Sequence, residues 1–208
     1  MVLEHIFVYK NNDMLKSTER KIKVDFNVII EAHEQAVAGL KANCLTELEK
    51  MAEICRQAVK NGHKILICGN GGSAADSQHI AAEFVGRFVK ERQGLPAIAF
   101  TTDTSILTAI GNDYGYDEVF RRQVEALGRE GDVLIGISTS GNSANIVKAF
   151  EQAKKQNVKT LALTGQSDSK MSALADVTLK VPAPVTARVQ ECHIMVGHMI
   201  CEYIDEEY

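Results

Sequence analysis

The chain has 208 residues, and its hydrophobic content of 45% is enough to bury one core within a single domain. A formal charge of −4 argues against a nucleic-acid-binding surface as the main function. No apolar run approaches the roughly 20 residues of a membrane span, and the first residues lack the basic and apolar regions of a signal peptide. Five cysteines without a CxxC motif predict reduced thiols in a cytoplasmic protein.

The N-terminal part predicts a polar tail over residues 1–20, followed by a single domain over 21–208. Apolar residues three, four or seven apart predict helices over 21–40 and 45–59. Two helices before the first strand exceed what a minimal doubly wound domain needs. Their spare apolar surface predicts a contact with a sister subunit.

From residue 64 onwards, short apolar runs alternate with helical patterns. The predicted strands cover 64–68, 96–100, 133–137, 159–163 and 177–181. The predicted helices between and after them cover 74–88, 106–110, 118–127, 144–156 and 187–204. This alternation predicts an α/β fold with a parallel sheet, and the nearly continuous apolar character of the strands predicts helices on both faces.

Two glycine- and serine-rich loops each join the end of a predicted strand to the start of a predicted helix. They are Gly69-Asn70-Gly71-Gly72-Ser73 and Ser138-Thr139-Ser140-Gly141-Asn142-Ser143. Glycines let backbone amides approach an anion closely, and a helix N-terminus offers unpaired N–H groups and the positive end of its dipole. Two such loops in one small domain predict a site for a phosphorylated ligand.

The first loop has two other interpretations. Residues 69–74 also satisfy the dinucleotide-binding pattern G-x-G-x-x-[GA] between a strand and a helix. That pattern wants an acidic residue near the end of the next strand, and Asp103 lies two residues too late. A plain tight turn is the other alternative.

The helix predicted over 74–88 carries polar residues four apart. Its buried side is predicted to contain Ala81, Phe84, Val85 and Phe88, whereas His79, Glu83 and Arg87 lie on the opposite side. The i, i+4 spacing brings the side chains of His79 and Glu83 together, so that they could bind one divalent metal or share acid–base work. An ordinary solvated helix face explains the same pattern.

The last predicted helix has an apolar stripe bordered by polar residues. Gln190 and His198 lie eight residues apart, about 80° around the helix axis, on a flank of this stripe. Both residue types can be metal ligands, although His198 taken alone is better explained as a structural histidine. His193 lies nearer the stripe and is predicted to be a hydrogen-bonded structural histidine. The predicted stripe consists of Val189, Cys192, Val196, Met199, Ile200 and Tyr203.

The segment 111–115, Gly-Asn-Asp-Tyr-Gly, is typical of a turn. Asn112 and Asp113 could face a sugar hydroxyl or a catalytic water, or could simply stabilise the turn.

Taken together, these motifs resemble those of the phosphoheptose isomerases in the sugar isomerase (SIS) domain superfamily. The similarity runs from about residue 25 to the end. The matching stretches are CGNGGSAADSQHIAAEFVGRF, LTAIGNDYGYDEVFRRQVEALGREGDVLIGISTSGNSANIVKA and ARVQECHIMVGH. The resemblance implies a flavodoxin-like five-stranded parallel sheet with helices on both faces, extra N-terminal helices, and a homotetramer with its sites at subunit contacts. It also implies interconversion of sedoheptulose 7-phosphate and D-glycero-D-manno-heptose 7-phosphate through an enediol, in bacterial nucleotide-heptose and lipopolysaccharide biosynthesis.

The resemblance further implies roles for individual residues. One zinc ion per subunit is expected on His79, Glu83, Gln190 and His198, with Glu83 and His198 also transferring protons and Gln190 also contacting substrate. Some members carry an acidic residue where this chain has Ala187, so no carboxylate role is expected there. Substrate-binding residues are expected to be Ser73, Ser138, Thr139, Ser140 and Ser143 for the phosphate, and Asn112 and Asp113 for the sugar.

A second functional class is compatible with the same fold. SIS domains also serve as non-catalytic modules, and one branch that binds the bacterial replication initiator resembles this chain in layout. That branch lacks the residue equivalent to Glu83, which is present here together with His198. The sequence therefore favours the enzyme over the interaction module.

Overall fold

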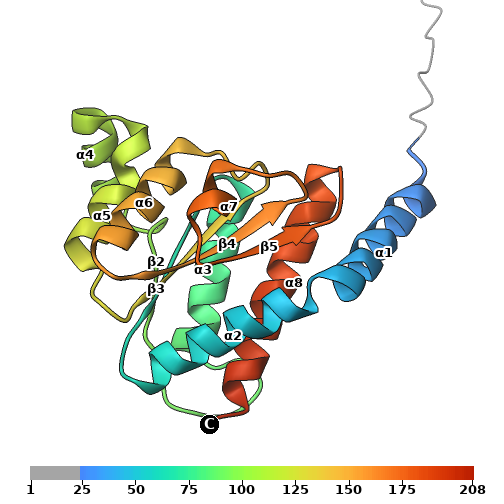
Figure 1. Ribbon diagram of the computed structural model, residues 1–208, viewed down its shortest axis with the longest axis horizontal. Coiled ribbons are helices and arrows are strands. Elements are labelled where there is room, and N and C mark those ends of the chain that lie inside the picture. Colours follow the sequence, from blue (N-terminus) through green and yellow to red (C-terminus); the bar gives the residue numbers. More distant parts are fainter. Residues whose placement is uncertain (1–23) are drawn as a thin grey trace, which may run out of the picture.

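The computed structural model describes residues 24–208, which form one parallel sheet with helices on both faces (Figure 1). The predicted tail, residues 1–20, lies outside the described residues. The strand order is β2-β1-β3-β4-β5, which confirms the flavodoxin-like architecture. The strands are β1 (Ile65–Gly69), β2 (Ala97–Ala99), β3 (Val133–Ser138), β4 (Lys159–Gly165) and β5 (Val177–Val181).

Alternate side chains of the strands pack into two cores, one on each face of the sheet. Ile65 and Ile67 of β1 lie in the first core, whereas Leu66 lies in the second. The helices of the first core are α1 (Phe26–Asn43), α2 (Leu45–Lys60), α3 (Gly72–Val85) and α8 (Thr186–Asp205). Those of the second core are α4 (Thr104–Tyr114), α5 (Val119–Leu127), which follows the 3₁₀ turn η1 (Tyr116–Glu118), α6 (Ala144–Lys155) and α7 (Lys170–Leu174).

Helices α3, α4 and α7 differ most from the prediction, whereas α1 begins at Phe26 and ends at Asn43 instead of covering 21–40. Helix α3 ends at Val85, before Gly86, so the prediction that it reached residue 88 is wrong, and the Val85 side chain is exposed. Helix α4 continues through 111–114, so Asn112 and Asp113 lie in its last turn and Gly115, with φ of 91°, follows it. Helix α7 was not predicted because its five residues are too few to show a helical period, although the capping box of Ser169 and Ser172 marks its start.

Helix α1 leaves much of its apolar surface uncovered. Figure 1 shows its first half projecting away from the sheet, while its second half lies beside α8. Phe26, Val28 and Ile30 are 72%, 59% and 56% exposed, whereas Ala36 and Leu40 are buried. In residues 24–208, no helix is both long enough and apolar enough to span a membrane.

Candidate functional site

The loop after β1 begins helix α3 with an abrupt change of chain direction. Gly71 has φ of 57°, a conformation that favours glycine, and the N–H groups of Ala74 and Ala75 both point to its carbonyl oxygen. Ser73 is almost fully buried in this turn, and its carbonyl oxygen accepts a hydrogen bond of 2.7 Å from the Ser77 hydroxyl. The turn thereby fixes the N-terminus of α3 at the carboxyl edge of the sheet.

The loop after β3 gathers three hydroxyl groups at the start of α6. Ser138 Oγ lies 3.0 Å from Ser143 Oγ and 3.4 Å from Ser140 Oγ. Ser143 is the N-cap residue of α6, but its side chain makes no capping hydrogen bond. Three hydroxyls beside a helix N-terminus suit the oxygens of a phosphate group. Thr139 lies between them, and its carbonyl oxygen accepts a hydrogen bond from the Gly165 N–H.

A pair of side-chain amides joins the first loop to the start of α6, and no local sequence pattern predicts it. Asn70 Nδ2 donates to Asn145 Oδ1 at 3.0 Å, and Asn145 Nδ2 donates back to Asn70 Oδ1 at 2.9 Å. The Tyr116 hydroxyl donates to the same Asn70 oxygen at 3.1 Å. Because β1 and β3 are neighbours at the point where the strand order reverses, the pair bridges the crevice in which this fold class binds ligands.

Helices α3 and α8 bring together the two histidines that the sequence singled out. His79 Nε2 lies 2.9 Å from His198 Nε2 and 3.3 Å from Glu83 Oε1. The helices approach closely here because residue 197 is glycine, where a Cβ atom would lie only 2.5 Å from Ile80 Cδ1. His79 and Glu83 lie together on α3 as predicted, and His198 joins them from α8, more than a hundred residues later in the chain.

Gln190 occupies a different position from this cluster. A Cβ atom on Gly72 would lie 2.8 Å from Gln190 Nε2, so the Gln190 amide packs against the first residue of α3. Helices α3 and α8 run parallel, and the eight residues between Gln190 and His198 correspond to a rise of about 12 Å. The structure thus brings His79, Glu83 and His198 together and places Gln190 beside the first loop.

The donor set of the cluster fits a divalent transition metal. Two imidazole nitrogens and one carboxylate oxygen lie within 4.8 Å of one another, and His₂Glu is a known zinc-binding set that leaves further coordination positions open. Asp76 lies one turn before His79, and one of its carboxylate oxygens is buried without a hydrogen-bond partner in residues 24–208. Burial raises the pKa of Asp76, and nearby His79 offsets part of that rise. Uncompensated acceptors beside this cluster would favour a bound cation.

The remaining predicted residues have mixed outcomes. Asn112 and Asp113 are exposed and hydrogen-bonded to each other at 2.8 Å. The Asp103 carboxylate, which the dinucleotide alternative required, instead caps α4 by accepting from the Ile106 N–H at 2.9 Å. The predicted apolar stripe of α8 is wrong at two positions, because Met199 and Tyr203 are partly exposed. Cys201 and Ile204 are buried in their place, since the helix packs mainly on α2 and α3.

His193 is the structural histidine that the sequence predicted. Its ring is fully buried, and Nε2 lies 3.2 Å from the Thr164 carbonyl oxygen, so Nε2 donates the hydrogen bond. Burial lowers the pKa of His193 to about 4, although the bond to Thr164 opposes this shift. The ring is therefore neutral near pH 7 and has no direct part in the cluster.

Comparisons with known proteins agree on one family. The SIS domain family matches residues 30–165. A phosphoheptose isomerase of Aliarcobacter butzleri is 56% identical over 176 residues, which cover 85% of this chain and 93% of that relative. The structure of phosphoheptose isomerase from Neisseria gonorrhoeae shares 48% identity with a TM-score of 0.81, covering 86% of this chain and 97% of that one. The enzyme from Francisella tularensis shares 38% identity with a TM-score of 0.84, covering 87% and 96%.

Proposed function

This chain belongs to the SIS domain family and, within it, to the phosphoheptose isomerases, and we propose that it interconverts sedoheptulose 7-phosphate and D-glycero-D-manno-heptose 7-phosphate. The observation that supports this reaction most directly is the convergence of His79, Glu83 and His198 on helices α3 and α8. The product would supply bacterial nucleotide-heptose biosynthesis.

Two parts of the chain would divide the work of binding and chemistry. The hydroxyls of Ser138, Ser140 and Ser143, at the N-terminus of α6, would hold the phosphate. Helix α3 begins at the first loop and carries His79 seven residues later, a rise of about 10 Å along its axis. Binding energy from the remote phosphate can orient the reacting end of the sugar. Gln190, Asn112 and Asp113 would contact the sugar.

The reaction moves a proton between C1 and C2 and a hydrogen between the two oxygens, through an enediol. It needs a base at carbon and a proton donor or acceptor at oxygen, both held in fixed positions. We assign the carbon base to Glu83 and the second proton-transfer role to His198. Zinc held by His79, Glu83 and His198, with Gln190 as a fourth candidate ligand, would polarise the substrate carbonyl as a Lewis acid. A carboxylate that binds a metal is a weaker base. Glu83 would therefore act as the carbon base mainly when it is not bound to the metal.

We also propose a cytoplasmic homotetramer. The exposed apolar residues of α1 would be covered by sister subunits. All five cysteines are free and buried, as expected in a reducing compartment.

The decisive test is Glu83→Gln, which keeps the shape of the side chain but removes the base. We expect kcat to fall by about 10² to 10⁴-fold while affinity for the sugar phosphate stays near wild type. Formation of the aldose from sedoheptulose 7-phosphate would be followed by NMR. Glu91→Gln is the matched control, because Glu91 is an exposed side chain whose ion pair in residues 24–208 is with Arg87. Substantial turnover by Glu83→Gln would contradict the assignment of the base.

A further inference from the structure

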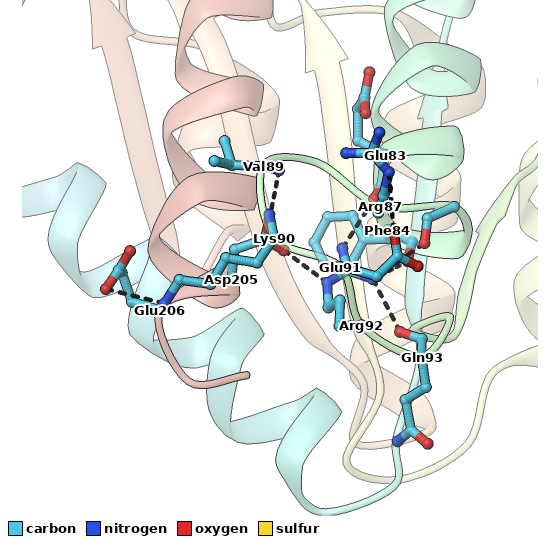
Figure 2. A network of polar contacts seen from close by, with 11 residues as sticks. Glu83, Phe84, Arg87, Val89, Lys90, Glu91, Arg92, Gln93, Asp205 and Glu206 are labelled. Atoms are coloured by element: carbon cyan, nitrogen blue, oxygen red, sulfur yellow. Dashed lines mark hydrogen bonds and ion pairs between the residues drawn. The ribbon is translucent and has the colours of Figure 1, made fainter.

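The segment from Gly86 to Arg92, called the strap below, folds from the end of α3 against the end of α8. Figure 2 shows Val89, Lys90 and Arg92 of the strap gathered around Asp205, the last residue of α8. Arg92 Nε donates to Asp205 Oδ1 at 2.6 Å, and the two side chains are only 3% and 1% exposed. This buried ion pair joins the strap, which directly follows α3, to α8, and these two helices carry the His79–Glu83–His198 cluster.

The guanidinium group of Arg92 also holds the end of α3. It donates to the carbonyl oxygen of Glu83 at 3.0 Å and to that of Phe84 at 2.9 Å. Carbonyl groups in the last turn of a helix have no partner within the helix, and Arg92 supplies a donor to both of these, beside the Leu95 N–H that also donates to Phe84. One of the two carbonyls belongs to the very residue whose side chain faces His79.

The carboxylate of Asp205 holds the other end of the strap. It accepts hydrogen bonds from the backbone N–H groups of Val89 at 2.7 Å and Lys90 at 3.0 Å. These bonds fix the residue just before them, Phe88, whose ring stacks on His198 with centroids 5.5 Å apart and an interplanar angle of 26°. Through this stack the strap contacts His198 as directly as it contacts the backbone of Glu83.

A buried ion pair is a weak source of stability, because the loss of hydration offsets much of the attraction between its charges. Its directional hydrogen bonds, however, define the position of every group that they join. We propose that Arg92 and Asp205 are positioning residues for the isomerase reaction, holding the Glu83 backbone and the Phe88–His198 stack in one frame. The inference rests on the proposed function, which assigns proton transfer to Glu83 and His198.

Arg92→Lys tests this role while keeping the positive charge beside Asp205. A lysine ammonium is a single point of charge and lacks the planar fork that serves the carboxylate and two carbonyl groups at once. We expect a folded protein whose kcat falls more than tenfold, whose KM stays within twofold, and whose zinc affinity, measured by competition with a chromophoric chelator, falls at least tenfold. A purely structural pair would lower thermal stability without this split.

Lys90→Met is the matched control. It removes an exposed ion pair between the strap and α8, Lys90 Nζ to Glu206 Oε2 at 3.3 Å, but keeps the Lys90 N–H that Asp205 binds. Its kcat and zinc affinity should stay within twofold of wild type. If folded Arg92→Lys also stays within twofold on both measurements, the positioning role is wrong.

Phe88→Leu tests the second contact of the strap, the stacking of Phe88 on His198. It also tests the positioning role if Arg92→Lys does not fold. It keeps both N–H bonds to Asp205 but removes the ring that stacks on His198. We expect the same loss of kcat and zinc affinity, and wild-type values in a folded protein would overturn the proposal. A wild-type chain that fails to isomerise sedoheptulose 7-phosphate would instead contradict the proposed function.

Discussion

Histidines occupy two contrasting environments along α8. The imidazole of His198 lies beside His79 at the protein surface, whereas that of His193 is buried and donates to the Thr164 carbonyl. The same residue type, five positions apart, therefore contributes to a polar cluster in one case and to the packing of α8 on β4 in the other. Burial in the second environment disfavours the charged form of the His193 ring.

His193 should make the free energy of unfolding depend on pH. Its pKa is lowered to about 4 in the folded protein from the ordinary value of 6.5, so between these pH values the unfolded chain binds more protons than the native one. Stability is therefore complete above about pH 6.5 and falls as pH drops toward 4, by a loss on the order of 3 kcal/mol. Urea unfolding at a series of pH values between 7 and 4 measures it.

His193→Gln is the variant to compare in that series. Glutamine keeps an N–H donor for the Thr164 carbonyl but does not titrate. Its stability should change less between pH 6.5 and 4 than that of the wild type. Parallel pH profiles for the two proteins would exclude His193 as the source of the acid sensitivity.

At the scale of elements, the contact between α3 and α8 decides whether the cluster exists. The helices pack tightly where Gly197 faces Ile80, and each of these residues is next to a cluster histidine. Because protein interiors are densely packed, a side chain at residue 197 must displace Ile80 or separate the helices.

Gly197→Ala should lower the free energy of unfolding by about 1–3 kcal/mol through this overpacking. Gly111→Ala is the matched control, since its new Cβ would have only Val119 Cγ1 at 3.9 Å within 4 Å and should leave α4 as stable or up to about 1 kcal/mol more stable. In an Ile80→Ala background, Gly197→Ala should cost little. Chemical denaturation of the single and double variants measures the coupling, and an equal cost in both backgrounds would contradict the overpacking mechanism.

Much of the fold could be predicted from the spacing of apolar residues, because strands and long helices each have a characteristic period of buried positions. Strand β5 was predicted at its observed bounds, Val177–Val181, and the His79–Glu83 pair followed from i, i+4 spacing. The Arg92–Asp205 pair could not be predicted in this way, because its members are 113 residues apart and neither lies in a repeating pattern. The end of α3 was misplaced for a related reason: the apolar Phe88 continues the helical period but belongs to the strap, where it packs on His198.

At the scale of the whole molecule, the sheet has both faces covered, but α1 has an uncovered side. Helix α8 contacts the first half of α1 through Arg188, which donates to the Ile29 carbonyl oxygen at 3.2 Å, but Phe26, Val28 and Ile30 are left exposed. An isolated helical segment gains most of its stability in water from packing, so the first half of α1 would be stabilised by a partner surface. A second copy of the chain presents the same apolar residues and is the partner that we propose.

Ile30→Glu should therefore shift the protein toward smaller assemblies, because a carboxylate in an apolar contact loses its hydration without gaining a partner. Sedimentation velocity at several protein concentrations measures the distribution of assemblies. Gln35→Glu is the matched control, since it adds the same charge at an exposed position of α1. An unchanged distribution for Ile30→Glu would show that this side of α1 is not the contact.

The paired amides of Asn70 and Asn145 have a consequence for how a ligand would be received. Each amide uses both a donor and an acceptor in the pair, so the first loop cannot move away from the start of α6 without breaking two hydrogen bonds. The loop after β1 and the start of α6 therefore hold a fixed relative position before any ligand binds. Little additional ordering of the backbone is then required when an anion binds between them, which lowers the entropic cost of binding.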